Sequence, residues 1–287
     1  FKYDPAVAES EIFKRETPDV RSAFHILNFQ DFYKVTVTQQ QLKLAFLSND
    51  GVQDLVTAIV NSMYSAANYD EFLVMKYMVA RAILDGTMTG VVVDPVSKEN
   101  SDNIVIKVKN TSNQMTFMCP DYNPAGVRNF SPKEDQYLIS SADFDATMNV
   151  ATLAQAFNMD KAEFDGHHVM VDSFGKLDNE RLEKLFGTDS WYAEIGASDL
   201  AKLAQVPAVL VDKAWFMVWD NLAEYSDQYN GQGLYWNYWY HVWKTFSVSP
   251  FANCAVFVTA PQTVTSVTVT PATATLPKGA SLDLAAK

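Results

Sequence analysis

The segment from Asp50 to Gly86 carries the strongest helical pattern in the chain. Asp50 can cap a helix N-terminus, and glycine is a common C-terminal stop. At about 1.5 Å per residue, one unbroken helix here would be a rod of roughly 50 Å, several times longer than a typical globular helix. A break near residues 68–70 would give two helices instead. The apolar residues at helical spacing are Val52, Leu55, Val56, Ile59, Val60, Met63, Tyr64, Phe72, Met75, Met78, Val79, Ala82 and Ile83.

The composition is that of a globular protein, since 48% of the 287 residues are hydrophobic and 20% are charged. This length suits one large domain or two ordinary ones. The sequence shows no run of about 18 or more apolar residues that could span a bilayer, and its first residues lack the apolar core of a signal peptide. A start at Phe1 suggests a processed, trimmed or incomplete N-terminus. The formal net charge of -12 disfavours nucleic-acid binding through counterion release.

Residues 20–38 contain two β-like runs rich in Phe, Tyr, Val and Thr, separated at residues 28–31. This pattern suits a hairpin or an extended ribbon. An isolated hairpin is marginal in water, and little apolar sequence surrounds this one. We therefore expect the ribbon to lie on something else.

The middle of the chain indicates a mixed α+β domain. Residues 104–108 fit a strand by propensity, yet one helical face also fits Ile104, Val108, Thr111, Met115 and Met118. Around this ambiguous segment we expect a strand at 91–96, a loop at 119–136, a strand at 137–149, a helix at 150–158 and a strand at 167–174.

The C-terminal half continues with two amphipathic helices, at 177–187 and 197–205. Apolar or alternating β runs follow at 206–218 and 234–258, joined by a polar loop at 223–233. After Pro261 the composition shifts abruptly to Thr, Ala and Val. Pro261 is therefore the expected domain boundary.

Known catalytic motifs are missing from the sequence, which has no Walker A motif, no GxGxxG, no GxSxG and no HExxH. The histidines His167 and His168, with Asp165 and Asp172, could in principle hold a metal ion. Neighbouring residues of a strand point to opposite faces, so at most one of the two histidines would serve a given site. We therefore predict no catalytic residue, metal or cofactor. Cys119 and Cys254 lie in apolar surroundings and are expected to be buried thiols.

The stretch LYWNYWYHVW (234–243) contains three tryptophans and three tyrosines. Strand alternation places Leu234, Trp236, Tyr238, Tyr240 and Val242 on one face, and Tyr235, Asn237, Trp239, His241 and Trp243 on the other. Both faces are bulky, whereas a sugar-binding strand usually exposes aromatic residues on one face and packs an apolar set on the other. The pattern favours a central strand in a core or subunit interface over an exposed sugar platform.

Two segments of the chain resemble the C-terminal part of the major capsid proteins of phi-29-like podoviruses. They are LVDKAWFMVWDNL (210–222) and GLYWNYWYHVWKTFSVSPFANCAVFV (233–258). The shared patterns are DK.WFMV.DNL, GLYWNY.YHVW and SVS.FAN. The segment YDPAVAESEIFKRETPDVRSAFH (3–25) resembles the entry to that family's extended loop, and AQAFNM (154–159) is a shorter match. The matches follow the family's order across residues 3–258.

This resemblance implies an α+β fold of the Hong Kong 97-like coat-protein type. Residues 1–47 would be the return of an extended loop, which lies across a neighbouring subunit, and the lead-in to the spine helix. Residues 48–139 would form the peripheral domain, with the spine helix at 50–86. Residues 140–208 would form the axial domain and 209–260 the return through the peripheral domain. The resemblance also favours a helix at 101–117.

The tail VTSVTVTPATATLPKGASLDLAAK (264–287) is similar to the opening of a group 2 bacterial immunoglobulin-like domain. About two strands of such a domain are present, fewer than the roughly seven of a complete sandwich. Residues 261–287 are therefore expected to be a linker and a truncated immunoglobulin-like segment.

The function implied by the resemblance is that of a major capsid protein, which self-assembles into the icosahedral head around double-stranded phage DNA. Its implied partners are copies of itself in pentamers and hexamers, a scaffolding protein, a portal and head fibres. The resemblance implies neither contact with a membrane nor enzymatic activity. Its place would be the virion capsid. The residues expected to serve structure or assembly are Phe24, Phe32, Tyr33, Trp215, Trp219, Trp236, Trp239, Trp243 and Phe251.

Two alternatives stay open at the level of the sequence. A cell-surface or cell-wall protein could use the aromatic strand to bind glycans and the immunoglobulin-like segment as a stalk. A metal-dependent enzyme could be built around His167 and His168.

Overall fold

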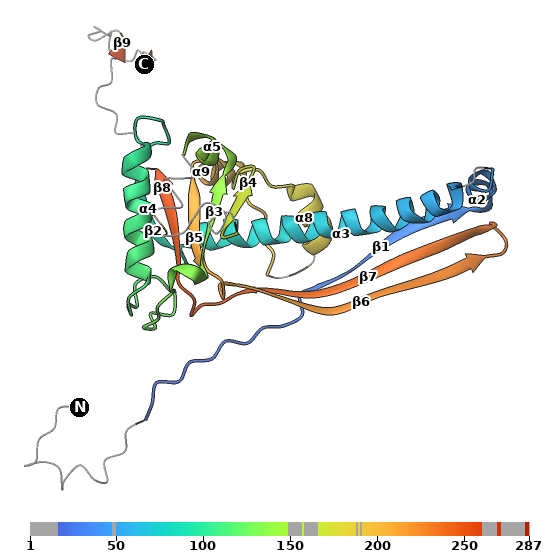
Figure 1. The fold of residues 1–287 in the computed structure, drawn as a ribbon, viewed down its shortest axis with the longest axis horizontal. Coiled ribbons are helices and arrows are strands. Elements are labelled where there is room, and N and C mark those ends of the chain that lie inside the picture. Colours follow the sequence, from blue (N-terminus) through green and yellow to red (C-terminus); the bar gives the residue numbers. More distant parts are fainter. Residues whose placement is uncertain are drawn as a thin grey trace, which may run out of the picture. The chain divides into compact units, whose positions relative to one another are not determined.

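The computed structural model describes residues 17–47, 50–148, 157, 166–187, 189, 191–259, 269–270 and 285–286. The chain divides into two compact units. The first comprises residues 1–72 and 216–250, and the second comprises residues 73–215 and 251–287. Figure 1 labels most of the helices and strands of both units.

The first unit is built on a three-stranded antiparallel sheet in the order β1–β7–β6. Strand β1 spans Phe29–Thr38, β6 spans Phe216–Asn230 and β7 spans Tyr235–Val248. Helix α2, Gln39–Ala45, follows β1 directly. A capping box starts α2, because the Thr38 side chain accepts from the Gln41 backbone N–H and the Gln41 side chain accepts from the Thr38 backbone N–H.

Helix α3 spans Gly51–Leu84 as one helix of 34 residues. The single long helix predicted for 50–86 is thus confirmed, and the alternative of two helices is wrong. Gly86 has a φ of 68°, the left-handed conformation in which glycine commonly ends a helix. The helix contributes to the first unit up to Phe72 and to the second unit from Leu73 onward.

Of the two structures predicted for residues 20–38, a hairpin or an extended ribbon, the hairpin is wrong. Residues 17–28 form no regular secondary structure, and β1 pairs with β7, from Phe29 opposite Lys244 to Thr38 opposite Tyr235. The polar loop expected at 223–233 is also mostly wrong, because β6 continues to Asn230 and residues 231–234 alone make the turn. There the Asn230 Oδ1 accepts from the backbone N–H groups of Gln232 and Gly233, both at 3.0 Å.

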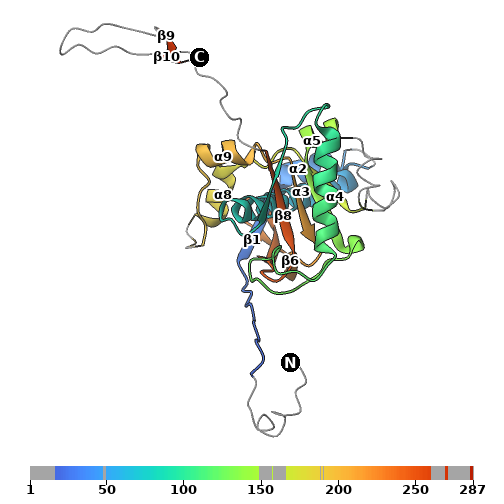
Figure 2. The same ribbon diagram turned by 90° about the vertical axis from the view of Figure 1, so that its left-hand side faces the viewer.

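The second unit contains a five-stranded mixed sheet in the order β2–β8–β5–β3–β4. Its strands are β2 (Thr89–Val93), β3 (Gln136–Ser141), β4 (His168–Val171), β5 (Ala208–Asp212) and β8 (Cys254–Thr259). Besides the part of α3 from Leu73 onward, the helices in its described residues are α4 (Ser101–Met115), the 3-10 helix η1 (Lys133–Asp135), α5 (Ala142–Thr147), α8 (Asn179–Phe186) and α9 (Ala197–Leu203). Figure 2 shows α4 on one side of strand β8 and α8 with α9 on the other.

The core of this unit explains why residues 104–108 are helical. Every residue of the central strand β5 is buried, and α4 packs its spaced apolar side chains onto the same cluster as Leu210 and Phe257. Spacing along the helix therefore prevails over the strand propensity of single residues. The helix favoured at 101–117 is confirmed, although Met118 lies beyond its end and is 70% exposed. The α4 residues in the cluster are Ile104, Val105, Val108 and Met115.

The strand expected at 137–149 ends early. Strand β3 stops at Ser141, whose Oγ accepts from the Phe144 backbone N–H and caps α5. The helix expected at 150–158 and the AQAFNM match lie outside the described residues, except for Phe157, which is buried.

In the C-terminal tail the structure describes two short strands. These are β9 (Val269–Thr270) and β10 (Ala285–Ala286), which pair antiparallel. The rest of residues 260–287, including Pro261, lies outside the described residues. The immunoglobulin-like segment therefore stays a prediction.

Candidate functional site

The aromatic stretch lies in β7 from Tyr235 to Trp243, and β7 is the central strand of the three-stranded sheet, whereas Leu234 belongs to the turn before it. Directly opposed residues of antiparallel strands point to the same face, so the register defines two faces. The inner face holds Val35, Val37, Tyr33, Trp236, Tyr238, Tyr240, Val242, Tyr225 and Tyr229, and the outer face holds Phe32, Lys34, Thr36, Tyr235, Asn237, Trp239, His241, Trp243 and Ser226. The predicted central strand and its alternation are confirmed from Tyr235 to Trp243, whereas the strand position expected for Leu234 is wrong, because this residue lies in the turn with a φ of 52°.

The inner face packs against the part of α3 that belongs to the same unit (Figure 1). The Tyr33 hydroxyl donates to Asp70 at 2.7 Å, and Asp70 is 1% exposed. Tyr64 of α3 contacts the ring of Tyr240 at a centroid distance of 5.2 Å. Tyr33 is itself buried. The helix therefore covers part of this face with both polar and aromatic contacts.

Lys244 joins three elements through charge. Its Nζ lies 2.7 Å from Glu71 of α3 and 2.8 Å from Asp220 of β6. Burial lowers the pKa of Lys244, but the hydrogen bonds to Asp220 and Glu71 outweigh it, and the pKa lies above its ordinary value. The side chain of Asp220 is mostly exposed, whereas those of Lys244 and Glu71 are largely buried. Glu71 is therefore the partner that matters more for stability.

Replacing Lys244 with methionine is expected to lower the free energy of unfolding by about 1–2 kcal/mol, because Glu71 loses a charged hydrogen-bond partner. The stabilisation is fully present below the unfolded lysine pKa of about 10.4 and is lost as pH rises through the raised folded pKa. Urea unfolding of both proteins at increasing pH measures this difference. Lys202→Met, which removes an exposed pair with Asp199, is the control and should change little; an equal loss in both variants would contradict the assignment.

The outer face leaves aromatic surface exposed. Phe32 is 53% exposed, Trp219 43% and Trp243 38%, while Trp239 and His241 are half-buried. Polar contacts set the aromatic rings in place, because Lys34 lies 5.7 Å above the Trp239 ring and His241 Nε2 lies 3.2 Å from the Ser226 Oγ. The expectation that both faces are covered is therefore not met in the single chain. The inner face is covered in part, since Tyr33 and Val242 are buried but Tyr225 is 45% exposed, and aromatic surface of the outer face stays exposed as well.

A β-bulge decides which aromatic residues of β6 join the outer face. The register shifts between Asp220 and Leu222. Before the shift Trp219 lies opposite Thr245, on the outer face; after it Tyr225 lies opposite Tyr240, on the inner face. Unbroken alternation would place the two odd-numbered residues on the same face.

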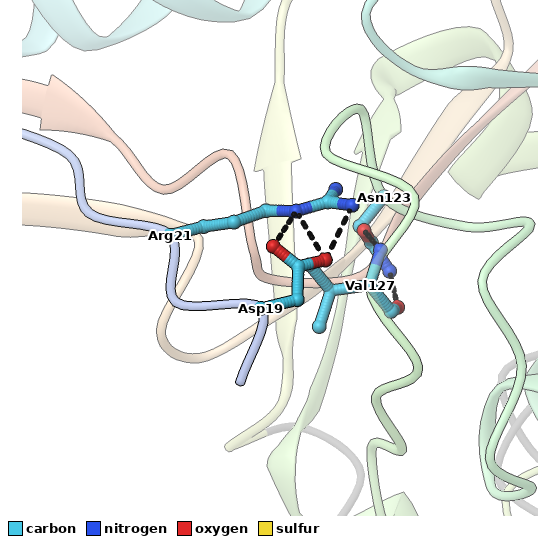
Figure 3. Close-up of polar contacts among 4 residues, drawn as sticks. All are labelled: Asp19, Arg21, Asn123 and Val127. Atoms are coloured by element: carbon cyan, nitrogen blue, oxygen red, sulfur yellow. Dashed lines mark hydrogen bonds and ion pairs between the residues drawn. The ribbon is translucent and has the colours of Figure 1, made fainter. Parts of the chain in front are cut away.

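The segment 17–28 is anchored at its C-terminal end. Asn28 exchanges two hydrogen bonds with the backbone of Phe246, at 2.8 and 2.9 Å, and His25 Nδ1 lies 2.6 Å from the Ser247 Oγ. Closer to the N-terminus of the segment, Asp19 and Arg21 form an exposed ion pair at 3.0 Å (Figure 3). Phe24 is 91% exposed. The segment therefore presents apolar surface next to the outer face.

The second unit holds a buried polar network that sequence reasoning missed. The Asn253 Nδ2 donates to the Ser131 Oγ at 3.1 Å, and its Oδ1 accepts from the Asn123 Nδ2 at 3.2 Å. Asn123 also closes the turn to Val127, accepting from its N–H and donating to its carbonyl (Figure 3). Gln136 adds a donor to the Ser131 carbonyl. The signal in the sequence was an asparagine set inside the apolar run FANCAVF.

Trp215 and Phe251, two of the residues expected to serve structure or assembly, lie near this network. Trp215 is 2% exposed, and its side chain is close enough to the Cys254 thiol to act on the thiol's pKa. The Phe251 carbonyl accepts from the Asn129 Nδ2 at 2.9 Å.

Burial raises the pKa of the Cys254 thiol to about 12, so it stays protonated. Cys254 is buried as predicted, whereas the prediction for Cys119 is wrong, because that thiol is half-buried.

The adjacent histidines have different partners, and His168 begins strand β4 whereas His167 lies in the turn before it. His167 Nε2 lies 2.9 Å from the Glu134 carbonyl oxygen, and His168 Nε2 lies 2.7 Å from the Ser140 Oγ. Of these partners Ser140 is fully buried. Across the part of the chain that the structure describes, no group of three or more His, Cys, Asp or Glu side chains is arranged to hold a metal ion.

Comparison with known proteins gives a match over most of the chain. The Phi29-like phage major capsid protein family matches residues 1–258. The major capsid protein of Bacillus phage PZA is 37% identical over 283 residues, which is 97% of this chain and 57% of that protein. The major capsid protein of Bacillus phage GA-1 is 35% identical over 292 residues, 99% of this chain and 56% of that protein. The chain thus spans a little over half the length of these curated relatives.

Solved structures show the same fold at low identity. A chain from the capsid structure of Staphylococcus phage Andhra superposes with a TM-score of 0.60 at 16% identity, covering 81% of this chain and 70% of that chain. A chain from the structure of head fiber and inner core protein gp22 of native bacteriophage P68 gives a TM-score of 0.61 at 14% identity, covering 90% and 77%. Neither comparison supports the glycan-binding alternative. Among the helices in the described ranges, none is both long and apolar enough to cross a membrane.

Proposed function

Because the chain belongs to the Phi29-like phage major capsid protein family, we propose that it builds the icosahedral head that encloses the double-stranded DNA of a phage. The family match over residues 1–258 is the observation that carries this proposal. The place of the protein would be the virion capsid, and its main partners would be further copies of itself in pentamers and hexamers. The role is structural, and we propose no catalytic residue.

Assembly needs surfaces that many copies can share, because each closed symmetric shell repeats a few contacts. The outer face and the segment 17–28 support such a role, since Phe32, Trp243 and Phe24 expose large aromatic areas. Exposed aromatic patches of this kind often mark contact sites between proteins. We propose that these residues contact a neighbouring copy, while Tyr33, Trp236 and Trp215 support the fold from inside.

The domain roles are proposals of the same kind. We propose residues 1–47 as the loop return, α3 as the spine helix within a peripheral domain of residues 48–139 and 209–260, and residues 140–208 as the axial domain. The unbroken length of α3 supports the spine assignment. A scaffolding protein, a portal and head fibres would be further partners. The net charge of -12 would limit adhesion of packed DNA to the shell.

The double variant Phe32→Ser with Trp243→Ser tests the proposed contact surface. We expect it to fold with an unchanged circular dichroism spectrum and to lose most of its assembly into rings, sheets or shells, followed by negative-stain microscopy and sedimentation. Trp191→Ser, at a position that is 44% exposed in the second unit, is the matched control and should assemble normally. Normal shells from the double variant would reject the outer face as a contact surface. A wild-type chain that stays monomeric under all assembly conditions would reject the proposed function itself.

A further inference from the structure

Three tyrosines from three elements meet beside the inner face of the sheet. Tyr225 of β6 stacks on Tyr240 of β7 with a centroid distance of 4.6 Å and an interplanar angle of 22°. Tyr64 of α3 lies 5.2 Å from Tyr240 and 6.1 Å from Tyr225. All three residues belong to the first unit.

The tyrosines combine close contact with access to solvent. Tyr64 is 43% exposed and Tyr225 is 45% exposed, while Tyr240 is half-buried between them. Burial raises the pKa of Tyr225 and of Tyr240, so both rings are neutral phenols near neutral pH. A small oxidant can reach the exposed rings, and the phenol protons can leave to water.

We propose that this cluster is an oxidative cross-linking site, in which a one-electron oxidant joins Tyr225 to Tyr240, or Tyr64 to either, as dityrosine. Each phenol loses one electron to the oxidant and its hydroxyl proton to water, which leaves two phenoxyl radicals. The radicals couple through ring carbons ortho to oxygen and form one C–C bond. The hydrogen on each coupled carbon then moves to the phenolic oxygen, restoring both rings. Two electrons and two protons leave in total, and no other bond breaks.

The partner in the cross-link decides its structural effect. A bond between Tyr225 and Tyr240 ties two neighbouring strands that already pair. A bond from Tyr64 ties α3 to the sheet across a long stretch of sequence, which removes more conformational freedom from the unfolded chain. This inference rests on the geometry of the first unit and does not depend on the proposed function.

The test oxidises the purified full chain briefly with photo-excited ruthenium tris-bipyridyl and persulfate. We expect dityrosine fluorescence, chains that keep monomeric mobility on denaturing gels, and peptide mass spectra in which the joined residues are 64, 225 or 240. Tyr240→Phe keeps the ring but should remove most of this intrachain product, because Tyr240 takes part in both of the closest pairs. Tyr229→Phe is the control, since Tyr229 is 43% exposed on the same strand as Tyr225 and its ring lies 4.5 Å from the Trp236 ring at a tilt of 40°. It should leave the yield unchanged.

Two outcomes would overturn the proposal. The first is an unchanged intrachain yield in Tyr240→Phe when circular dichroism shows that the variant is folded. The second is a wild-type product in which other tyrosines are joined as often as those of the cluster. Cross-links between chains are distinguished by their doubled mass on the same gels and do not count toward the intrachain yield.

Discussion

Replacing Trp215 with alanine is expected to lower the free energy of unfolding by about 3–5 kcal/mol, the range measured when a large aromatic side chain is removed from a packed core. Trp215 is 2% exposed, and its side chain contacts Cys254, which is fully buried. The surrounding backbone is fixed, because the Trp215 N–H donates to the Asp212 carbonyl at 2.8 Å. The site can therefore collapse little around the cavity. Guanidinium unfolding followed by circular dichroism measures the loss.

Trp191→Ala separates the effect of burial from the effect of losing a tryptophan. Trp191 is 44% exposed and packs on Phe186 at a centroid distance of 4.7 Å, so its truncation should cost clearly less. If both variants lose the same stability, Trp215 is not the core residue that its burial indicates.

The variant Asn253→Ala is expected to lose about 2–4 kcal/mol of stability, because buried groups of Ser131 and Asn123 each lose a hydrogen-bond partner. Asn253 and Ser131 are both 0% exposed. Water cannot readily replace the missing partner at such depth. The backbone of Asn253 also accepts from the Asp212 N–H at 2.9 Å, so the network lies between the loop at 119–136 and the sheet. Chemical denaturation gives the change.

The variant Asn253→Asp adds a pH signature to the same site. The new carboxyl is fully buried, so its folded pKa should lie above the unfolded value of about 3.9. Below that value both states are protonated and the variant is close to wild type in stability; the destabilisation grows as pH rises. Unfolding of variant and wild type at several pH values tests this. Asn103→Asp, at an exposed position in the first turn of α4, should show no such growth, and a flat difference for Asn253→Asp would show that its carboxyl reaches solvent.

Features encoded by neighbouring residues were predictable from the sequence. The long helix follows from apolar spacing between Asp50 and Gly86, and the alternation of 234–243 follows from the two-residue period of a strand. The segment 104–108 shows the limit of local propensity, since residue preference favours a strand while the pattern of the whole segment forms α4. The early end of β3 had a local signal that was missed, the capping residue Ser141.

Features that depend on distant partners were not predictable. Asn253 reads as one polar residue in an apolar run, and its role depends on Ser131 and Asn123, which lie more than a hundred residues away. The three tyrosines likewise come from separate elements and meet through packing alone. No local pattern marks either group, because neither is regular along the chain.

The sequence by itself determined the periodic elements, the two-faced aromatic strand and the resemblance to the capsid family. The tertiary structure alone decided that β1 pairs with β7, that α3 packs on the inner face and that the bulge after Asp220 moves Tyr225 away from the face of Trp219. The physical reason is the distance along the chain over which each kind of interaction acts. A helix or strand period is set by backbone geometry over a few residues, whereas strand pairing and face selection depend on which surfaces the whole chain can bury together.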